Sequence, residues 1–201
     1  RYRWGVADRL LSVEDSRRGE TRYSYTPTGQ LERAEYPDGR ERWRKSDQTG
    51  NLYPDPDMRL RRYLGGGRLE QDGEWHCEYD ADGNLTERYL GTGRWLDGKK
   101  DRWRYRWNAD GSLAKVVRPD KREVEFTYDA LGRRLSKSFG TTVTRWVWNG
   151  NVPLHQWKQH REYSVVEDRW DTDTERRDMT VWLFDEESFV PVAMLKEGRS
   201  Y

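Results

Sequence analysis

Long apolar runs, an excess of charge of one sign and paired cysteines are all missing from this sequence. The apolar runs extend over only a few residues, which excludes a transmembrane helix and a signal-peptide core. With 37 basic and 36 acidic side chains the net charge is +1, so the basic excess typical of phosphate-binding domains is absent. The single cysteine, Cys77, excludes an internal disulfide.

Tryptophan and tyrosine, by contrast, are abundant. Charged residues make up 36% of the chain and hydrophobic residues 33%, a balance that by itself favours disorder. The 11 Trp and 12 Tyr argue against disorder, because each ring buries a large area when a chain folds. We therefore expect a folded chain whose core is aromatic rather than aliphatic.

Turn signals predict an all-β fold. No stretch keeps the helical apolar period between recognisable caps. Instead, short alternating segments are separated by dipeptides suited to tight hairpin turns. These dipeptides are Asp38-Gly39, Asp72-Gly73, Asp82-Gly83, Asp97-Gly98, Asp110-Gly111 and Asn149-Gly150. The pattern predicts successive antiparallel β-hairpins.

An internal repeat supports this architecture. When the chain is shifted against itself by 82 residues, the segment from Arg22 to Glu41 matches the segment from Arg104 to Glu123. The shared core is an aromatic residue, three residues, Gly, one residue and Leu. It recurs at Tyr25, Gly29 and Leu31; Tyr63, Gly67 and Leu69; Tyr79, Gly83 and Leu85; Trp107, Gly111 and Leu113; and, with the leucine shifted by one, at Tyr128, Gly132 and Leu135.

The repeat has a physical interpretation. The aromatic residue ends the incoming strand, glycine supplies the positive φ of the turn, and leucine opens the outgoing strand across from the ring. A single hairpin cannot bury its aromatic face alone, so neighbouring hairpins must stack edge to edge. We expect an open, curved sheet whose edge strands need flanking repeats or another chain to cover them. The chain begins and ends within such strands, as a fragment of a longer polypeptide would.

Several longer strings resemble a known family. They are "CEYDADGNLTERY", "RWNADGSLAKVVRPDKREVEFTYDALGRRLSKS", "TRWVWNGNVPLHQW" and the closing "VWLFDEESFVPVAMLKEG". These strings are similar to the YD repeats of bacterial Rhs (rearrangement hot spot) proteins, of insecticidal toxin-complex C components and of teneurins. The likeness extends over nearly the whole chain and is densest from Tyr79 to Leu195.

The resemblance implies a section of a spiral β-shell that encloses a C-terminal toxin. It implies flanking repeats and the enclosed toxin as partners, and secretion or delivery by a bacterial system such as type VI secretion, or display at the cell surface. The self-cleaving aspartates and the DPxGL-type motif of the family are absent here. We therefore expect no catalysis in this segment and no cofactor, and a single repeat region over residues 1–201.

The string "RWRYRW", residues 102–107, allows two interpretations. Rings interleaved with arginines are suited to a groove for single-stranded nucleic acid. The same alternation describes a β-strand with one aromatic face and one solvated basic face. Because the string aligns with the incoming strand of another repeat, where the arginines are mostly missing, we expect the strand and no nucleic-acid partner.

Other candidate sites are weak. The acids of "DADGN", residues 80–84, and "DTDTE", residues 171–175, lack the ligand spacing of a calcium loop. His76 and Cys77 are adjacent in a strand and point to opposite faces, so they cannot hold one metal together. His155 and His160 have no completing ligands. We expect no metal site, and expect Cys77 to be a small buried hydrophobe.

Two segments interrupt the repeats and are expected to be irregular loops. Residues 53–63 contain two prolines that forbid a central strand, and residues 166–179 are dense in alternating charge. The main alternative function is a carbohydrate-binding surface made of exposed rings, and a weaker one is an enzyme on an all-β barrel. The exposure of the aromatic rings distinguishes the shell from the carbohydrate-binding surface. Packing in a shell covers most rings, whereas a carbohydrate-binding surface leaves a row of rings exposed to solvent.

Overall fold

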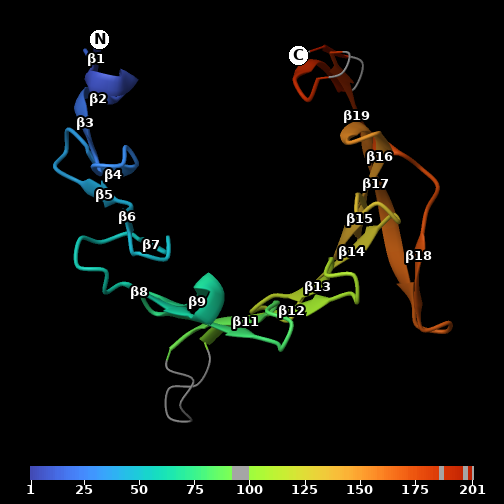
Figure 1. Ribbon diagram of the computed structural model, residues 1–201. Coiled ribbons are helices and arrows are strands. Elements are labelled where there is room, and N and C mark those ends of the chain that lie inside the picture. The colour runs from blue at the N-terminus through green and yellow to red at the C-terminus, as the bar shows by residue number, and fades with distance from the viewer. Residues whose placement is uncertain (92–99, 186–187, 197–198, 201) are drawn as a thin grey trace. The chain divides into compact units, whose positions relative to one another are not determined.

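The computed structural model describes residues 1–91, 100–185, 188–196 and 199–200 (Figure 1). Within these residues every regular element is a β-strand except for two short 3-10 turns, η1 (Val6–Asp8) and η2 (Gly65–Gly67). The predicted all-β class is therefore confirmed. The turn expected at Asp97-Gly98 lies outside the described residues.

The described residues form two compact units, the first of which contains residues 1–78 with 90–91. It holds a five-stranded sheet in the order β1-β2-β3-β4-β5, a two-stranded sheet β6-β7, and the antiparallel run β8-β9-β10. The strand bounds are β1 Tyr2–Trp4, β2 Leu10–Asp15, β3 Gly19–Tyr25, β4 Leu31–Glu35, β5 Glu41–Trp43, β6 Lys45–Ser46, β7 Leu52–Tyr53, β8 Arg61–Leu64, β9 Arg68–Asp72 and β10 Trp75–Tyr79.

The second unit contains residues 79–89 and the described residues from 100 onward. Its strands pair in the order β11-β12-β13-β14-β15-β16-β17-β19-β20-β21, and β18 pairs with β17 outside this path. The bounds are β11 Leu85–Leu90, β12 Lys100–Trp107, β13 Leu113–Val117, β14 Glu123–Tyr128, β15 Arg134–Phe139, β16 Thr142–Asn149, β17 Val152–Ser164, β18 Arg169–Thr172, β19 Arg177–Phe184, β20 Pro191–Lys196 and β21 Arg199–Ser200.

Each sheet grows by adding the next hairpin in chain order. Consecutive strands pair antiparallel, as β12 with β13, β13 with β14 and β14 with β15 do. Among the described residues, the first and last strands of a sheet do not pair with each other, so the sheets are open rather than closed barrels. This confirms the architecture of successive hairpins in open sheets.

The core is thinner than the composition suggests. The buried hydrophobic residues of the described chain are Ala34, Cys77, Tyr89, Val116, Val117, Val143 and Trp157. Every large side chain in the described residues keeps at least 2% of its surface exposed. Most Trp and Tyr rings are half-buried. The expectation of an aromatic core is therefore corrected. A single sheet layer covers most rings on one side only, so small residues fill most of the few enclosed positions, and Tyr89 and Trp157 are the two rings among them.

The segment "RWRYRW" is an ordinary sheet strand within β12. Its three rings are half-buried, namely Trp103, Tyr105 and Trp107. Its three arginines are exposed, namely Arg102, Arg104 and Arg106. Tyr105 lies across from Val116 of β13, which in turn lies across from Val124 of β14. The strand prediction is confirmed, because side chains that alternate along the strand take alternate faces of the sheet.

The two segments expected as irregular loops differ from each other. Residues 54–60 form bends and turns between β7 and β8. Residues 166–179, in contrast, contain all of β18 and the first residues of β19. The alternating charges do not prevent pairing there, since Arg169 of β18 forms ion pairs with Glu167 and Asp171 on its own segment.

One five-residue turn recurs through both units. The first residue donates its amide to the carbonyl of the fifth, and the fourth donates its amide to the carbonyl of the first. Copies are Thr26–Gln30, Tyr36–Arg40, Asp47–Asn51, Asp80–Asn84, Asn108–Ser112, Arg118–Arg122 and Asp129–Arg133. The fourth residue has a positive φ in each copy and is glycine in all but one, for example Gly83 (87°), Gly111 (79°) and Gly132 (76°).

The exception is Lys121, which has φ of 64° where the copy 82 residues earlier has Gly39 with φ of 80°. A side chain in this region costs about 1–2 kcal/mol, so we expect Lys121→Gly to raise the free energy of unfolding by about 0.5–1 kcal/mol after the added flexibility of the unfolded chain is subtracted. Urea denaturation measures the change. The matched control, Gly39→Lys, should lower the same quantity, and equal effects of the two substitutions would contradict the strain argument.

Candidate functional site

The junction between one repeat and the next is the site that the sheet architecture depends on. Each junction begins with the aromatic residue of the repeat, which lies across from the residue six positions later. These register pairs are Trp4 with Leu10, Tyr25 with Leu31, Tyr63 with Leu69, Trp107 with Leu113 and Tyr128 with Arg134. The register shifts immediately before the aromatic residue in every pair, which is the mark of a β-bulge.

Two repeat positions differ from the sequence prediction. In the repeat that begins at Tyr128, Arg134 occupies the leucine register and Leu135 does not. The leucine of this repeat thus lies one position beyond the register partner of Tyr128, because pairing geometry rather than residue type sets the register. The pair Trp4 and Leu10 was missed, since Asp8, with φ of 52°, stands where the motif requires glycine.

Acidic side chains hold the turns. Asp80 Oδ1 accepts hydrogen bonds from the amides of Asp82 at 3.1 Å and Asn84 at 2.8 Å. Asp129 Oδ1 accepts from the amides of Leu131 and Arg133, both at 2.9 Å. Where the first residue of the turn is not acidic, the third takes over, as Asp38, Asp110 and Asp120 do toward the fifth amide. The carboxylates of "DADGN" therefore cap a turn.

The polar tip of the aromatic residue connects consecutive repeats. Tyr128 Oη donates to the carbonyl of Leu113 at 3.0 Å, and Trp107 Nε1 donates to the carbonyl of Leu85 at 2.8 Å. Both acceptors open the outgoing strand of the preceding repeat. The same bond runs from Tyr25 to Leu10, from Tyr63 to Leu52 and from Trp148 to Arg134. We call this bond the junction bond.

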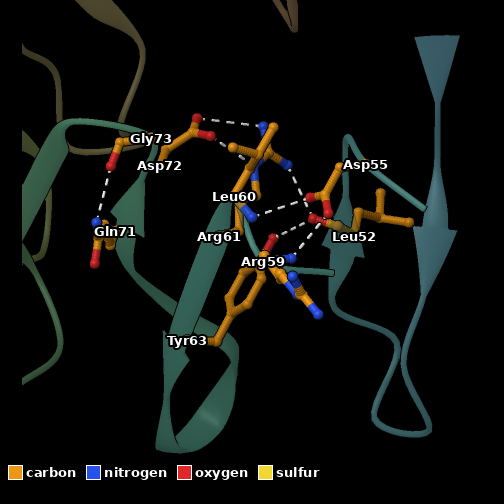
Figure 2. Close-up of polar contacts among 9 residues, drawn as sticks. All are labelled: Leu52, Asp55, Arg59, Leu60, Arg61, Tyr63, Gln71, Asp72 and Gly73. Carbon is orange, nitrogen blue, oxygen red and sulfur yellow. Dashed lines mark hydrogen bonds and ion pairs between the residues drawn. The ribbon is translucent and has the colours of Figure 1, made fainter. Parts of the chain in front are cut away.

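Figure 2 shows one junction of the first unit in full. The carbonyl of Leu52 accepts Tyr63 Oη at 2.5 Å and Arg61 Nη1 at 3.0 Å, and Arg61 Nε also pairs with Asp72 Oδ1 at 3.0 Å. The turn before β8 is held by Asp55, whose carboxylate accepts the amides of Arg59 and Leu60 at 2.9 and 3.0 Å. One backbone carbonyl thus gathers two donors from the next hairpin.

Sequence reasoning placed the ring of the motif but missed its polar tip. Leu52, Arg134 and Trp148 were not recognised as partners, because the acceptor is a backbone carbonyl that residue type does not reveal. One signal was present, however. The aromatic position of the motif is Tyr or Trp in each copy and never one of the four phenylalanines, which have no donor.

Arginine side chains cover several ring faces. The guanidinium carbon of Arg134 lies 4.5 Å from the Trp146 ring centroid, that of Arg33 5.3 Å from Trp43, and that of Arg176 4.8 Å from Trp157. Cations over ring faces stabilise aromatic residues that one sheet layer leaves half-exposed. Such covered rings do not form a bare stacking row, so the carbohydrate alternative has no support from this arrangement.

The face of the second unit opposite Trp146 carries a ladder of ion pairs. Lys115 Nζ lies 2.6 Å from Glu123 and 3.1 Å from Glu125, and Glu125 also pairs with Arg161 at 3.2 Å. Desolvation raises the pKa of Glu125, but hydrogen bonds from Lys115 and Arg161 outweigh it and leave that pKa below its ordinary value. The ladder explains how a face with so many charges stays electrically balanced.

The remaining sequence candidates are the metal-site residues and Cys77. Within the described ranges, no three His, Cys, Asp or Glu side chains come close enough to hold a metal ion. Cys77 is buried in β10, as expected. In the same part of the chain, we find no helix with the length and apolar character to cross a membrane.

A substitution that removes a single oxygen atom tests the junction bond. Tyr128→Phe removes the hydroxyl and leaves the carbonyl of Leu113 without this donor, so the free energy of unfolding should fall by about 0.5–1.5 kcal/mol. The control is Tyr23→Phe, because the Tyr23 hydroxyl makes no hydrogen bond within the described chain and its loss should have little effect. Chemical denaturation of the two variants compares them, and equal losses would contradict the role of the bond.

Acid should weaken the turns. Desolvation raises the pKa of Asp47, but hydrogen bonds from Asn51 and Thr49 outweigh it and lower the pKa to about 2. A carboxyl whose folded pKa lies below its unfolded value of about 3.9 stabilises the fold above that value, and this contribution is lost as the pH falls from about 4 toward 2. The hydrogen bonds to Asp80 and Asp110 lower their pKa values in the same direction.

Urea denaturation between pH 7 and pH 2.5 measures this loss. The control variant is Asp47→Asn, which has the size of the carboxyl but no charge to lose. The difference in free energy of unfolding between the parent chain and Asp47→Asn should shrink as the pH falls. A difference that is constant over this range would show that the ionised form of Asp47 does not stabilise the turn.

Comparison with known proteins agrees with this geometry. Residues 5–149 match the Teneurin YD-shell family. The double-stranded DNA deaminase toxin A of Burkholderia cenocepacia (strain H111) is 32% identical over 163 residues, 74% of this chain and 11% of that protein. The probable deoxyribonuclease RhsB of Dickeya dadantii (strain 3937) is 27% identical over 105 residues, 51% of this chain and 7% of that protein.

A solved structure shows the same fold. In a Photorhabdus luminescens Tc holotoxin pore with a mutation in TccC3, the matching region aligns with a TM-score of 0.50 and 13% identity, covering 98% of this chain and 11% of that chain. This chain therefore spans between 7% and 11% of the length of these relatives. The resemblance to Rhs and YD-repeat proteins is confirmed. This chain, with its hairpins repeated in chain order and joined by bonds from ring to carbonyl, belongs to the teneurin YD-shell family.

Proposed function

We propose that this chain is a section of shell wall that encloses and helps to deliver a toxin polypeptide, and that the section itself does no catalysis. The observation that carries the proposal is the junction bond. Because aromatic tips such as those of Trp107 and Tyr128 donate to the hairpin before them, a wall of this kind extends hairpin by hairpin and has no natural stopping point. Such construction is suited to enclosing a volume.

The relatives support the enclosed cargo. Two are named for a DNA deaminase toxin and a probable deoxyribonuclease, yet this chain matches only 11% and 7% of their lengths. We infer that the named activities reside in other parts of those proteins, and that the repeat region shared with this chain supplies the container. The partners of this chain are flanking repeats and the enclosed toxin, delivered by a bacterial secretion system such as type VI.

The chemistry of the described side chains is consistent with a wall. The carboxylates that sequence motifs single out are engaged in turns, as in Asp80 and Asp129, or in ion pairs, as in Asp171 and Asp173. Groups engaged in this way hold the backbone of the wall. We infer that binding and catalysis belong to the enclosed segment.

Limited proteolysis of the full-length protein tests the proposal. The segment that follows the repeats should resist protease while the wall is intact. Breaking three junction bonds at once, with Tyr25→Phe, Trp107→Phe and Tyr128→Phe, should expose that segment at a protease concentration that leaves the parent protein uncut. The control carries Tyr23→Phe, which breaks no junction bond.

Two results would overturn the proposal. One is a downstream segment that is cut equally fast in the parent protein and in the triple variant. The other is deamination or cleavage of double-stranded DNA by this chain on its own, measured by sequencing and by gel electrophoresis after incubation with purified protein.

A further inference from the structure

The hairpin formed by the end of β17 and by β18 departs from the rule that each hairpin pairs with the next. Residues 161–164 of β17 pair with β18 and extend beyond the pairing of β17 with β16, which ends at His160. Figure 1 shows β18 beside the far end of β17. We call residues 161–172 the projecting hairpin.

A buried arginine fixes the base of the projecting hairpin. Arg161 is only 7% exposed, and its Nε donates to the carbonyl of Gly140 at 2.8 Å while its Nη1 pairs with Glu125 at 3.2 Å. Its guanidinium also lies 4.3 Å from the Trp170 ring centroid. The hairpin is therefore held in one direction relative to the sheet, although isolated two-stranded hairpins are marginal in water.

The outer part of the projecting hairpin is apolar and exposed. Tyr163 and Trp170 meet edge to face at 5.4 Å, and they are 42% and 43% exposed. At the tip, Val165 and Val166 are 83% and 95% exposed. An anchored element that displays two rings and two valines to solvent has the composition of a contact surface, in which aromatic residues are enriched.

The backbone adds a second means of recognition. In the described chain, β18 pairs with β17 alone, so the outer edge of Arg169–Thr172 has backbone groups with no strand partner. An extended segment from another polypeptide can pair with such an edge and gain main-chain hydrogen bonds. Charge selects the segment. The projecting hairpin carries four acids and two arginines, a net charge of −2, in a chain of net charge +1, and one of the arginines, Arg161, is buried.

We propose that the projecting hairpin is a docking element for an extended polypeptide segment in which basic side chains alternate with apolar ones. The segment pairs with the edge of β18, its basic residues face Glu162 and Asp171, and its apolar residues contact the valine tip and the Trp170 ring. A second copy of the hairpin does not suit this edge, since acids would then face acids. The inference is independent of any enclosed toxin.

Fluorescence anisotropy with labelled eight-residue peptides tests the proposal on the full chain. Alternating Lys-Val peptide should bind, with an affinity that falls as salt rises, and alternating Glu-Val peptide should not. Glu162→Lys with Asp171→Lys should weaken Lys-Val binding about fivefold or more, because rim charges set the electrostatic attraction. Val165→Ser with Val166→Ser, at a tip too exposed to affect folding, should weaken it about threefold.

The matched control is Val190→Ser with Val192→Ser, two valines of β20 and its approach that are 63% and 62% exposed but outside the hairpin. It should bind the Lys-Val peptide as the parent chain does. Equal binding of the two peptides would overturn the proposal, as would hairpin variants that bind like the parent. Binding to phosphatidylcholine vesicles without binding to the Lys-Val peptide would assign the valine tip to a lipid surface and also overturn it.

Discussion

The hydrogen bond from an aromatic tip to the carbonyl that opens the preceding outgoing strand is the interaction on which the rest of this structure depends. A β-bulge before the ring aims the tip backward, and the glycine turn brings the next strand into register. Leaving the carbonyl of Leu113 without the Tyr128 donor affects two hairpins at once. This is why the motif uses Tyr and Trp, whose rings pack while their tips donate.

Charge has a local role throughout the chain. On one face of the second unit, lysine and arginine form a ladder with glutamates, as Lys115 does with Glu123 and Glu125. On the other face, arginines such as Arg134 lie over rings that one sheet layer leaves half-exposed. Exposed ion pairs contribute little individually, so the near-zero net charge reflects many small balanced contacts rather than one strong electrostatic site.

The projecting hairpin shows what happens when the rule of serial pairing is interrupted. The last residues of β17 extend beyond its pairing with β16, and they pair with β18. Arg161 compensates by joining the hairpin base to Gly140 and Glu125. A sheet that otherwise repeats one unit thereby acquires a local surface with its own charge and apolar tip.

The sequence by itself determined the class of fold and the spacing of the turns. Alternation and Asp-Gly dipeptides reflect local rules, since the positive φ at Gly83 or Gly111 favours a residue without a side chain. The aromatic face of β12 followed from the same local alternation. The aromatic positions of the repeats were predicted for the same reason.

Tertiary structure decided what depends on pairing. Register put Arg134 rather than Leu135 across from Tyr128, and it made Trp4 and Leu10 a repeat pair although Asp8 replaces the motif glycine. The acceptor of each junction bond is a backbone carbonyl, and every residue has one, so only the folded arrangement selects Leu113 or Leu85. The strand in residues 169–172 likewise forms because β17 supplies an edge, a condition that its charged residues do not reveal.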